Sequence, residues 1–144
     1  MNSSAFSLKG ENGVITVKVL GYENPQAKDV SDANWLKAEI DFNSGGCAIC
    51  YRAALTTSDI KCFQDELESI FSSLEGSASF LTDEDAITLQ VEISNIGAIK
   101  VSGELKEVGL AKIKVAFEFC SDQSFLGGTI SELQELQSKY PIIK

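Results

Sequence analysis

Four cysteines are the first residues of this sequence that could carry chemistry, and two of them form the motif Cys47-Ala-Ile-Cys50. A redox-active CxxC motif belongs at a helix N-terminus, where the helix dipole lowers the pKa of the first thiol. Here the motif lies in a strand-like pattern, which would direct the two side chains to opposite faces. A zinc site would require further ligands, and Cys62 and Cys120 do not stand at finger-like spacing. We therefore interpret all four as reduced thiols with a structural role, and we expect no metal and no cofactor.

Acidic side chains are the second candidate for chemistry, since Asp83, Glu84 and Asp85 are consecutive. Such a cluster could bind a cation or a basic partner, or it could be a solvated hairpin loop, in which aspartate is favoured. It lacks the twelve-residue spacing and the central glycine of a calcium loop. The sequence does not pair any two of its 21 acidic residues as a glycosidase would, and it contains no GxSxG, GxGxxG or P-loop motif. These motifs therefore do not indicate an enzyme.

Composition excludes further classes of function. The chain has 144 residues, with 12 Lys and Arg against 21 Asp and Glu, a net charge of −9 and no histidine. Phosphate contacts need clustered Lys and Arg, so we expect no direct contact with nucleic acid. Without histidine the chain cannot build a Ser-His-Asp or Cys-His triad. Composition favours a binding protein, and an enzyme that uses carboxylates or a thiolate beside Lys is kept as an alternative.

The sequence shows no targeting or membrane-spanning pattern. Residues 1–10 lack a basic segment followed by an apolar run, and no apolar stretch approaches the roughly 18 residues of a membrane span. The length is typical of one domain. We therefore expect a single domain over residues 1–144, in the cytoplasm and without contact to a membrane.

The elements that must position these residues are mostly strands. Apolar residues alternate with polar ones, as in Ile87, Leu89, Val91 and Ile93, which is typical of antiparallel strands with one buried face. Glycines in the short connections favour hairpins. The pattern predicts strands over residues 6–9, 15–19, 36–42, 49–55, 78–81, 87–93, 99–105 and 113–119. Four of them, between residues 78 and 120, should form a meander.

Two amphipathic helices interrupt the strands. The first is predicted over residues 57–75, behind a capping box of Thr56 and Asp59, and the second over residues 130–139. Thr129 and Glu132 have the spacing of a second capping box, and Asp122 to Leu126 is expected to lie between the last strand and a turn at Gly127-Gly128. Because strands cluster in runs, the sequence predicts an α+β fold of mostly antiparallel sheet, with seven to eight strands, sandwich-like or strongly curved.

The longest irregular segment, residues 23–34, is a candidate functional loop because loops of this length often carry function. Trp35 follows it and is out of phase with the buried set of its strand. It could be an exposed anchor, since Trp is enriched among interface hot spots, or it could cover a sheet end or pack under the loop.

Short motifs in a fixed order suggest a family. Phe6-x-Leu8 begins the order, the 15–19 strand and Asp32-Ala-Asn-Trp-Leu36 follow it, and Leu55-Thr56 opens a helix. Asp122-Gln-Ser-Phe-Leu126 then precedes a terminal helix that ends at Pro141. This order and the total length resemble the WapI-type immunity proteins of bacterial polymorphic toxin systems.

The resemblance implies a small cytoplasmic protein that binds and neutralises a cognate toxin domain, often a nuclease, without catalysis. An acidic inhibitor would be steered to the basic surface that a nuclease presents to nucleic acid. The alternative is a β-rich module whose strands wrap a small ligand. Monomer and homodimer both stay open. The candidate partner-binding residues are Glu23, Asp29, Asp32, Trp35, Asp83, Glu84 and Asp85.

Overall fold

The structure, a computed structural model, describes residues 4–82, 86–108 and 112–144. Its strands form two antiparallel sheets of four, each in chain order. The first sheet consists of β1 (Ala5–Lys9), β2 (Val14–Tyr22), β3 (Trp35–Ser44) and β4 (Cys47–Thr56). The second consists of β5 (Gly76–Leu81), β6 (Ile87–Ile93), β7 (Ile99–Val108) and β8 (Lys112–Ser121). The α+β fold and the meander are thus confirmed, although several strands are longer than predicted.

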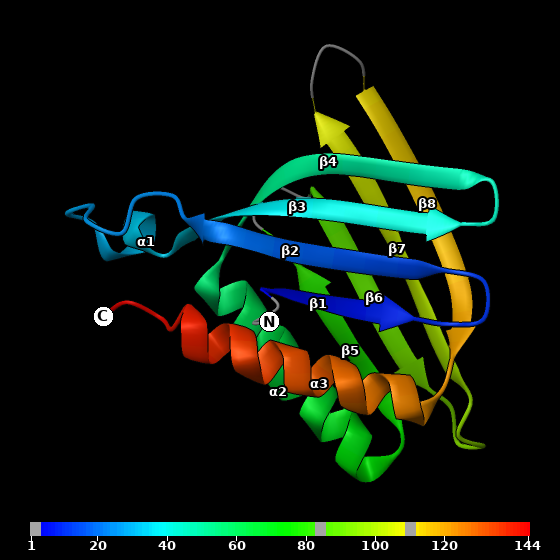
Figure 1. The fold of residues 1–144 in the computed structure, drawn as a ribbon. Coiled ribbons are helices and arrows are strands. Elements are labelled where there is room, and N and C mark those ends of the chain that lie inside the picture. Colours follow the sequence, from blue (N-terminus) through cyan, green and yellow to red (C-terminus); the bar gives the residue numbers. More distant parts are fainter. Residues whose placement is uncertain (1–3, 83–85, 109–111) are drawn as a thin grey trace.

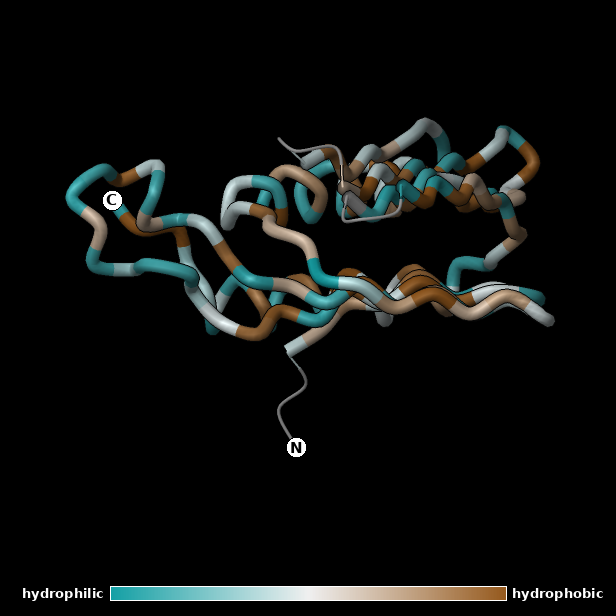
Figure 2. Tube along the Cα trace, turned by 90° about the horizontal axis from the view of Figure 1, so that it is seen from above, coloured by the Kyte–Doolittle hydropathy of each residue, from teal (hydrophilic) through white to brown (hydrophobic). Residues whose placement is uncertain are grey.

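The two sheets form the layers of a sandwich, and their strands cross at an angle (Figure 1). Figure 2 shows the layers from above, with the chain between residues 22 and 35 and the C-terminus extending beyond them on one side. The apolar residue of each alternating pair faces the opposite sheet, because each Å² of apolar surface removed from water stabilises the fold by about 25 cal/mol. Among the described residues, no helix has the length and apolar character needed to cross a membrane.

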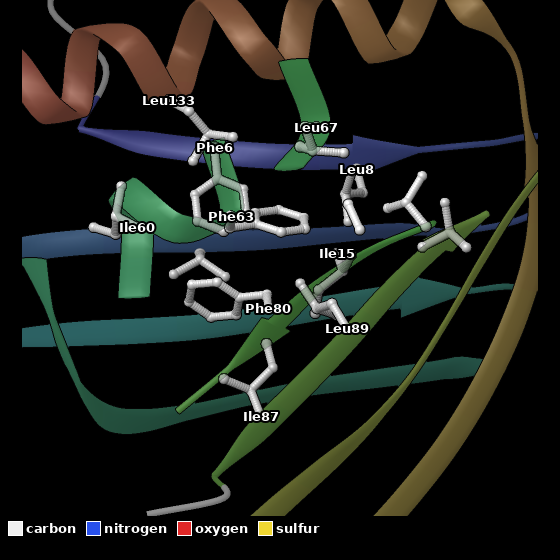
Figure 3. Close-up of a cluster of buried hydrophobic side chains, with 14 of the residues drawn as sticks. Phe6, Leu8, Ile15, Ile60, Phe63, Leu67, Phe80, Ile87, Leu89 and Leu133 are labelled. Atoms are coloured by element: carbon white, nitrogen blue, oxygen red, sulfur yellow. The ribbon is translucent and has the colours of Figure 1, made fainter. Parts of the chain in front are cut away.

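The helix α2 (Thr57–Ser73) connects the two sheets and begins where the sequence predicts. Its capping box is confirmed: the Asp59 amide donates to the Thr56 hydroxyl at 3.2 Å, and the Thr56 amide donates to the Asp59 carboxylate at 2.9 Å. The buried stripe of α2 places Phe63 between β1 and β5. The rings of Phe6, Phe63 and Phe80 lie 5.3–5.7 Å apart, centroid to centroid, and fill the centre of the core (Figure 3).

The last helix, α3 (Gln123–Lys139), corrects one prediction, since it begins seven residues before the expected start at residue 130. Asp122 is its N-cap and accepts from the amides of Ser124 and Phe125, at 2.9 and 3.3 Å. Gly127 and Gly128 therefore lie inside the helix and form no turn. A Cβ at Gly127 would be in ordinary van der Waals contact with the ring of Phe71 on α2, at 3.6 Å.

The expected capping box of Thr129 and Glu132 is wrong for the same reason, because both residues lie within α3. They point to strand β1 instead. The Ser7 amide donates to the Glu132 carboxylate at 2.9 Å, and the Thr129 hydroxyl donates to the Ser7 carbonyl at 2.5 Å. The residues three apart share one face of the helix, and that face holds the outer edge of β1.

Candidate functional site

The segment between β2 and β3, residues 23–34, projects beyond the sheets at the end where the C-terminus lies (Figure 1). It contains a single helical turn, α1 (Val30–Ala33), which the sequence did not predict. Asp29 is the N-cap and accepts from the Ser31 amide at 2.9 Å. Asp29 and Asp32 are exposed, and so is Val30. The segment thus carries acidic side chains at the surface.

Asn34 is the residue that holds this projection in place, and sequence reasoning missed it. Its side chain is 7% exposed. The amide nitrogen donates to the carbonyls of Val30 and Ile143, each at 2.9 Å, while the amide oxygen accepts from the Ile143 amide and the Thr57 hydroxyl, each at 2.7 Å. One buried side chain therefore joins α1, the start of α2 and the C-terminal tail. In the sequence, only its place in the Asp32–Leu36 motif distinguishes Asn34 from other polar residues.

A surface hollow of about 510 Å³ lies beside these contacts. Trp35 lines it together with Val30 and the tail residues Ile142 and Ile143. The indole is half-buried, so Trp35 both packs against the structure and presents a face to the hollow. The structure therefore brings Trp35 next to the segment that carries Asp29 and Asp32.

Glu23 lies apart from this hollow and lines another of about 310 Å³ beside β4. The remaining predicted residues, Asp83, Glu84 and Asp85, fall outside the described residues. Of the predicted residues, Trp35 thus lines one hollow and Glu23 lines another.

The outer edges of the two first strands are covered by helices. On β1 the cover is α3, through Glu132 and Thr129 as described above. On β5 it is α2, and the Ser79 amide donates to the Glu66 carboxylate at 3.2 Å. An uncovered strand edge invites pairing with another chain, so each glutamate removes an amide from such pairing.

The opposite edges, those of β4 and β8, are covered less completely. The turn after β1 reaches the C-terminal end of β8, where the Glu11 amide donates to the Cys120 carbonyl at 3.1 Å and the Ser121 hydroxyl donates to the Lys9 carbonyl. Along β4, two hollows follow the free edge. One of about 310 Å³ lies beside residues 52–54, and one of about 230 Å³ lies beside residues 48–51.

The four cysteines are free, and all four are exposed. Cys47 and Cys50 lie on β4 at positions that alternate across the sheet. Desolvation, with the charges of Glu39 and Asp41, raises the pKa of the Cys50 thiol above its ordinary value. Less thiolate means a weaker nucleophile. Among the described residues, His, Cys, Asp and Glu form no group of three that could hold a metal ion.

The sequence matches the family model of the immunity protein WapI-like family over residues 6–141. The chain belongs to this family. The motifs that suggested it in the sequence have structural roles here: Asp122 caps α3, Thr56 caps α2 and Asn34 holds α1. No curated protein matches the chain.

Solved structures show where else this WapI-like fold occurs. The structure of MRP1/MRP2 from Trypanosoma brucei matches with a TM-score of 0.53 at 8% identity, covering 96% of this chain and 87% of that one. The structure of WHY1 from Arabidopsis thaliana matches with a TM-score of 0.51 at 15% identity, covering 97% and 91%. The plant transcriptional regulator PBF-2 matches with a TM-score of 0.50 at 15% identity, covering 94% and 80%. At these identities the likeness shows the fold alone.

The charge of this WapI-like chain gathers on its helices. Residues 57–75 and 122–139 hold eight of the acidic side chains but only two basic ones, Lys61 and Lys139. The eight are Asp59, Asp65, Glu66, Glu68, Glu75, Asp122, Glu132 and Glu135. Three more acids are Asp83, Glu84 and Asp85, and the rest of the chain is balanced, with ten acidic and ten basic residues. The side that carries α2 and α3 is therefore the acidic one.

Proposed function

We propose that this protein neutralises a cognate bacterial toxin domain by binding it directly in the cytoplasm. The observation that carries the proposal is the family match, which spans nearly the whole chain. An inhibitor of this kind needs a surface and no catalytic group. Two features agree with binding without catalysis: the sequence contains no histidine, and the raised pKa of the Cys50 thiol makes it a weak nucleophile.

The charge supports a toxin whose surface is basic. A net charge of −9 attracts such a domain over a distance of about one Debye length, roughly 8 Å at physiological salt. The same charge repels nucleic acid, so the protein competes with nucleic acid for the toxin and does not bind nucleic acid itself. Long-range attraction raises the association rate, whereas affinity also needs a desolvated apolar contact.

The test uses the C-terminal domain of the toxin protein that the adjacent gene encodes. Expressed alone in the cytoplasm, this domain should arrest growth, and co-expression of the present chain should restore it. The purified pair should form a complex in titration calorimetry. A toxic domain that is neither bound nor neutralised would overturn the proposal.

The projection of residues 23–34 is a candidate contact with the toxin, together with Trp35. Reversing one exposed charge there, Asp32→Lys, should slow association with a basic toxin several-fold at low salt and less at high salt. Reversing Glu118→Lys on β8 is the matched control, because it also changes the net charge by two. Equal effects of the two substitutions would show that only net charge matters.

A further inference from the structure

The free edge of β4 presents backbone groups to which another strand can bond. Gly45 and Gly46 form the two-residue turn before β4, and Gly45 has a φ of +54°. Such a turn makes its flanking residues, Ser44 and Cys47, a hydrogen-bonded pair. Alternation then directs the odd-numbered residues of β4 to β3, and the even-numbered ones to the open edge. The Thr56 amide follows the same alternation, because this even-numbered residue donates to Asp59 and not to β3.

Four residues of β4 therefore present backbone groups outward: Ala48, Cys50, Arg52 and Ala54. Their N–H groups have no partner within the described residues, whereas β1 and β5 have amides that donate to Glu132 and Glu66. The seven residues from 48 to 54 span roughly 23 Å at about 3.3 Å per residue. The exposed backbone is thus long enough for a strand of ordinary length.

Two hollows lie beside these groups, and we call them together the edge groove. The 230 Å³ hollow is lined by apolar side chains of β4, β7 and β8, among them Ile49, Leu105, Ile113 and Val115. The 310 Å³ hollow is lined by Ala53, Ala54 and Ala86 and by the charged residues around them. Between the hollows, the Tyr51 hydroxyl donates to the Ala86 carbonyl at 2.6 Å and closes the core below.

The second sheet reaches past β4 at this place. Figure 1 shows the end of β7 and the start of β8 extending beyond the β4 edge. Leu105 of β7 is buried between the sheets, and its register partner is Val115. Ile113 precedes Val115 by two residues on the same strand and pairs with Glu107, so Ile113 lies on the same inner face. With no strand of the first sheet above it, Ile113 is 46% exposed. One strand added to β4 would cover it.

We propose that an extended segment of the toxin domain adds to the free edge of β4 as a fifth strand of the first sheet and covers the edge groove. This inference rests on the proposed function and names the surface that performs it. The main chain of the segment bonds the outward groups of β4, and its inward side chains pack on Ile113 and Val115.

A second copy of this chain does not fit the groove as well. The only strand it could offer in symmetrical pairing is its own β4, whose inward residues already pack against its own second sheet, as the bond from Tyr51 to Ala86 shows. That strand cannot also cover the Ile113 of a neighbour. A segment whose apolar face is free in the unbound toxin can do so.

Charge describes the segment further. Glu107 lines the same hollow as Ile113, while Lys37, Arg52 and Lys106 line the other hollow with Glu23. The segment should therefore have alternating apolar residues over about seven positions, a basic residue near Glu107 and an acidic residue near Lys37 and Arg52. Glu23, one of the predicted site residues, would then line the contact.

The test compares two pairs of variants for binding to the C-terminal domain encoded by the adjacent gene. Cys50→Pro removes an outward amide without removing a bond to β3, and Cys50→Ala keeps the amide. Ile113→Lys places a charge in the edge groove, and Ile96→Lys places one on an 86% exposed residue between β6 and β7. We expect Cys50→Pro and Ile113→Lys to raise Kd at least tenfold, and each control to change it less than about twofold.

The outcomes separate the two proposals. If the wild-type chain does not bind the domain, the proposed function fails and this inference fails with it. If the wild type binds and both Cys50→Pro and Ile113→Lys bind as their controls do, the edge is not used and the function stands. Should Cys50→Pro not fold, as judged by circular dichroism, Ile113→Lys decides alone. A homodimer that Ile113→Lys dissociates would assign the edge to a second copy and overturn the inference.

Discussion

The strand edges on the two sides of the sandwich differ in how far they are covered. On one side, β1 and β5 lie under α3 and α2, each held through a glutamate, and the aromatic rings of the core lie beneath. On the other side, β4 leaves its backbone groups and an apolar groove to solvent. The helix after each sheet packs on the first strand of the other sheet, so the chain closes one side and leaves its last strands open. Stability should therefore reside on the closed side, and binding on the open one.

The closed side should lose the most from a truncation in its aromatic cluster. Phe63 is fully buried against Phe6 and Phe80, so Phe63→Ala should lower the free energy of unfolding by about 3–5 kcal/mol. Phe71 on the same helix is 37% exposed, and Phe71→Ala should cost less than half as much. Urea unfolding of both variants measures the difference. Equal losses would show that the closed side is not where stability is concentrated.

The end of the sandwich where β8 meets the β1–β2 turn should tolerate no added atom. A Cβ at Gly10 would lie 2.1 Å from the Cys120 carbonyl oxygen and 2.4 Å from the Phe119 ring. Gly10→Ala should therefore destabilise the protein by about 1–3 kcal/mol through overpacking. Gly46→Ala on the β3–β4 turn meets nothing within 4 Å and should change stability by less than about 0.5 kcal/mol. Thermal melts that rank the two the other way would contradict the close contact.

Glu132 of α3 should contribute to stability because it accepts from the Ser7 amide of β1. Glu132→Ala leaves the half-buried Ser7 amide without its acceptor, which should cost about 1.5 kcal/mol and speed hydrogen exchange at that amide. Glu135→Ala, exposed on the same helix, should do neither. Unchanged exchange at Ser7 in the first variant would mean that the edge is not held by this bond.

On the open side, Tyr51 should have the smallest effect on stability. Burial raises the pKa of its hydroxyl to about 12. The unfolded chain loses this proton near pH 10, so between about pH 10 and 12 the unfolded state binds fewer protons and stability falls as pH rises. Tyr51→Phe should cost about 1 kcal/mol at neutral pH and remove the part of the alkaline slope that Tyr51 contributes, leaving the part due to Tyr22, whose pKa burial also raises. A slope that is unchanged in the variant would belong to other groups.

The sequence predicted the strands well because alternation with a period of two depends only on which face is buried. It predicted α2 for the same kind of reason, through a local capping box. It misplaced the start of α3, because a pair of glycines is typical of a turn and the role of Asp122 as N-cap was not recognised. Thr129 and Glu132 are three residues apart, a spacing found both in a capping box and on one face of a helix. Only the position of β1 decides between the two roles.

Contacts distant in sequence explain what else was missed. Asn34 bonds Ile143, 109 residues away, and nothing in a local pattern indicates that partner. The open edge of β4 likewise depends on the position of the second sheet, because the alternation of β4 resembles that of a covered strand. Among the predicted contact residues, Trp35 lines the hollow beside α1, while Glu23 lines one of the two hollows of the edge groove.

Hydrogen exchange of the whole chain, free and bound to the toxin domain of the adjacent gene, tests the account most directly. In the free protein the amides of Ala48, Cys50 and Ala54 should exchange fast. On binding they should become protected, and amides on α2 and β1 should change little. Protection confined to the acidic face of α2 and α3, with β4 unchanged, would contradict the claim that the open side of the sandwich binds the toxin.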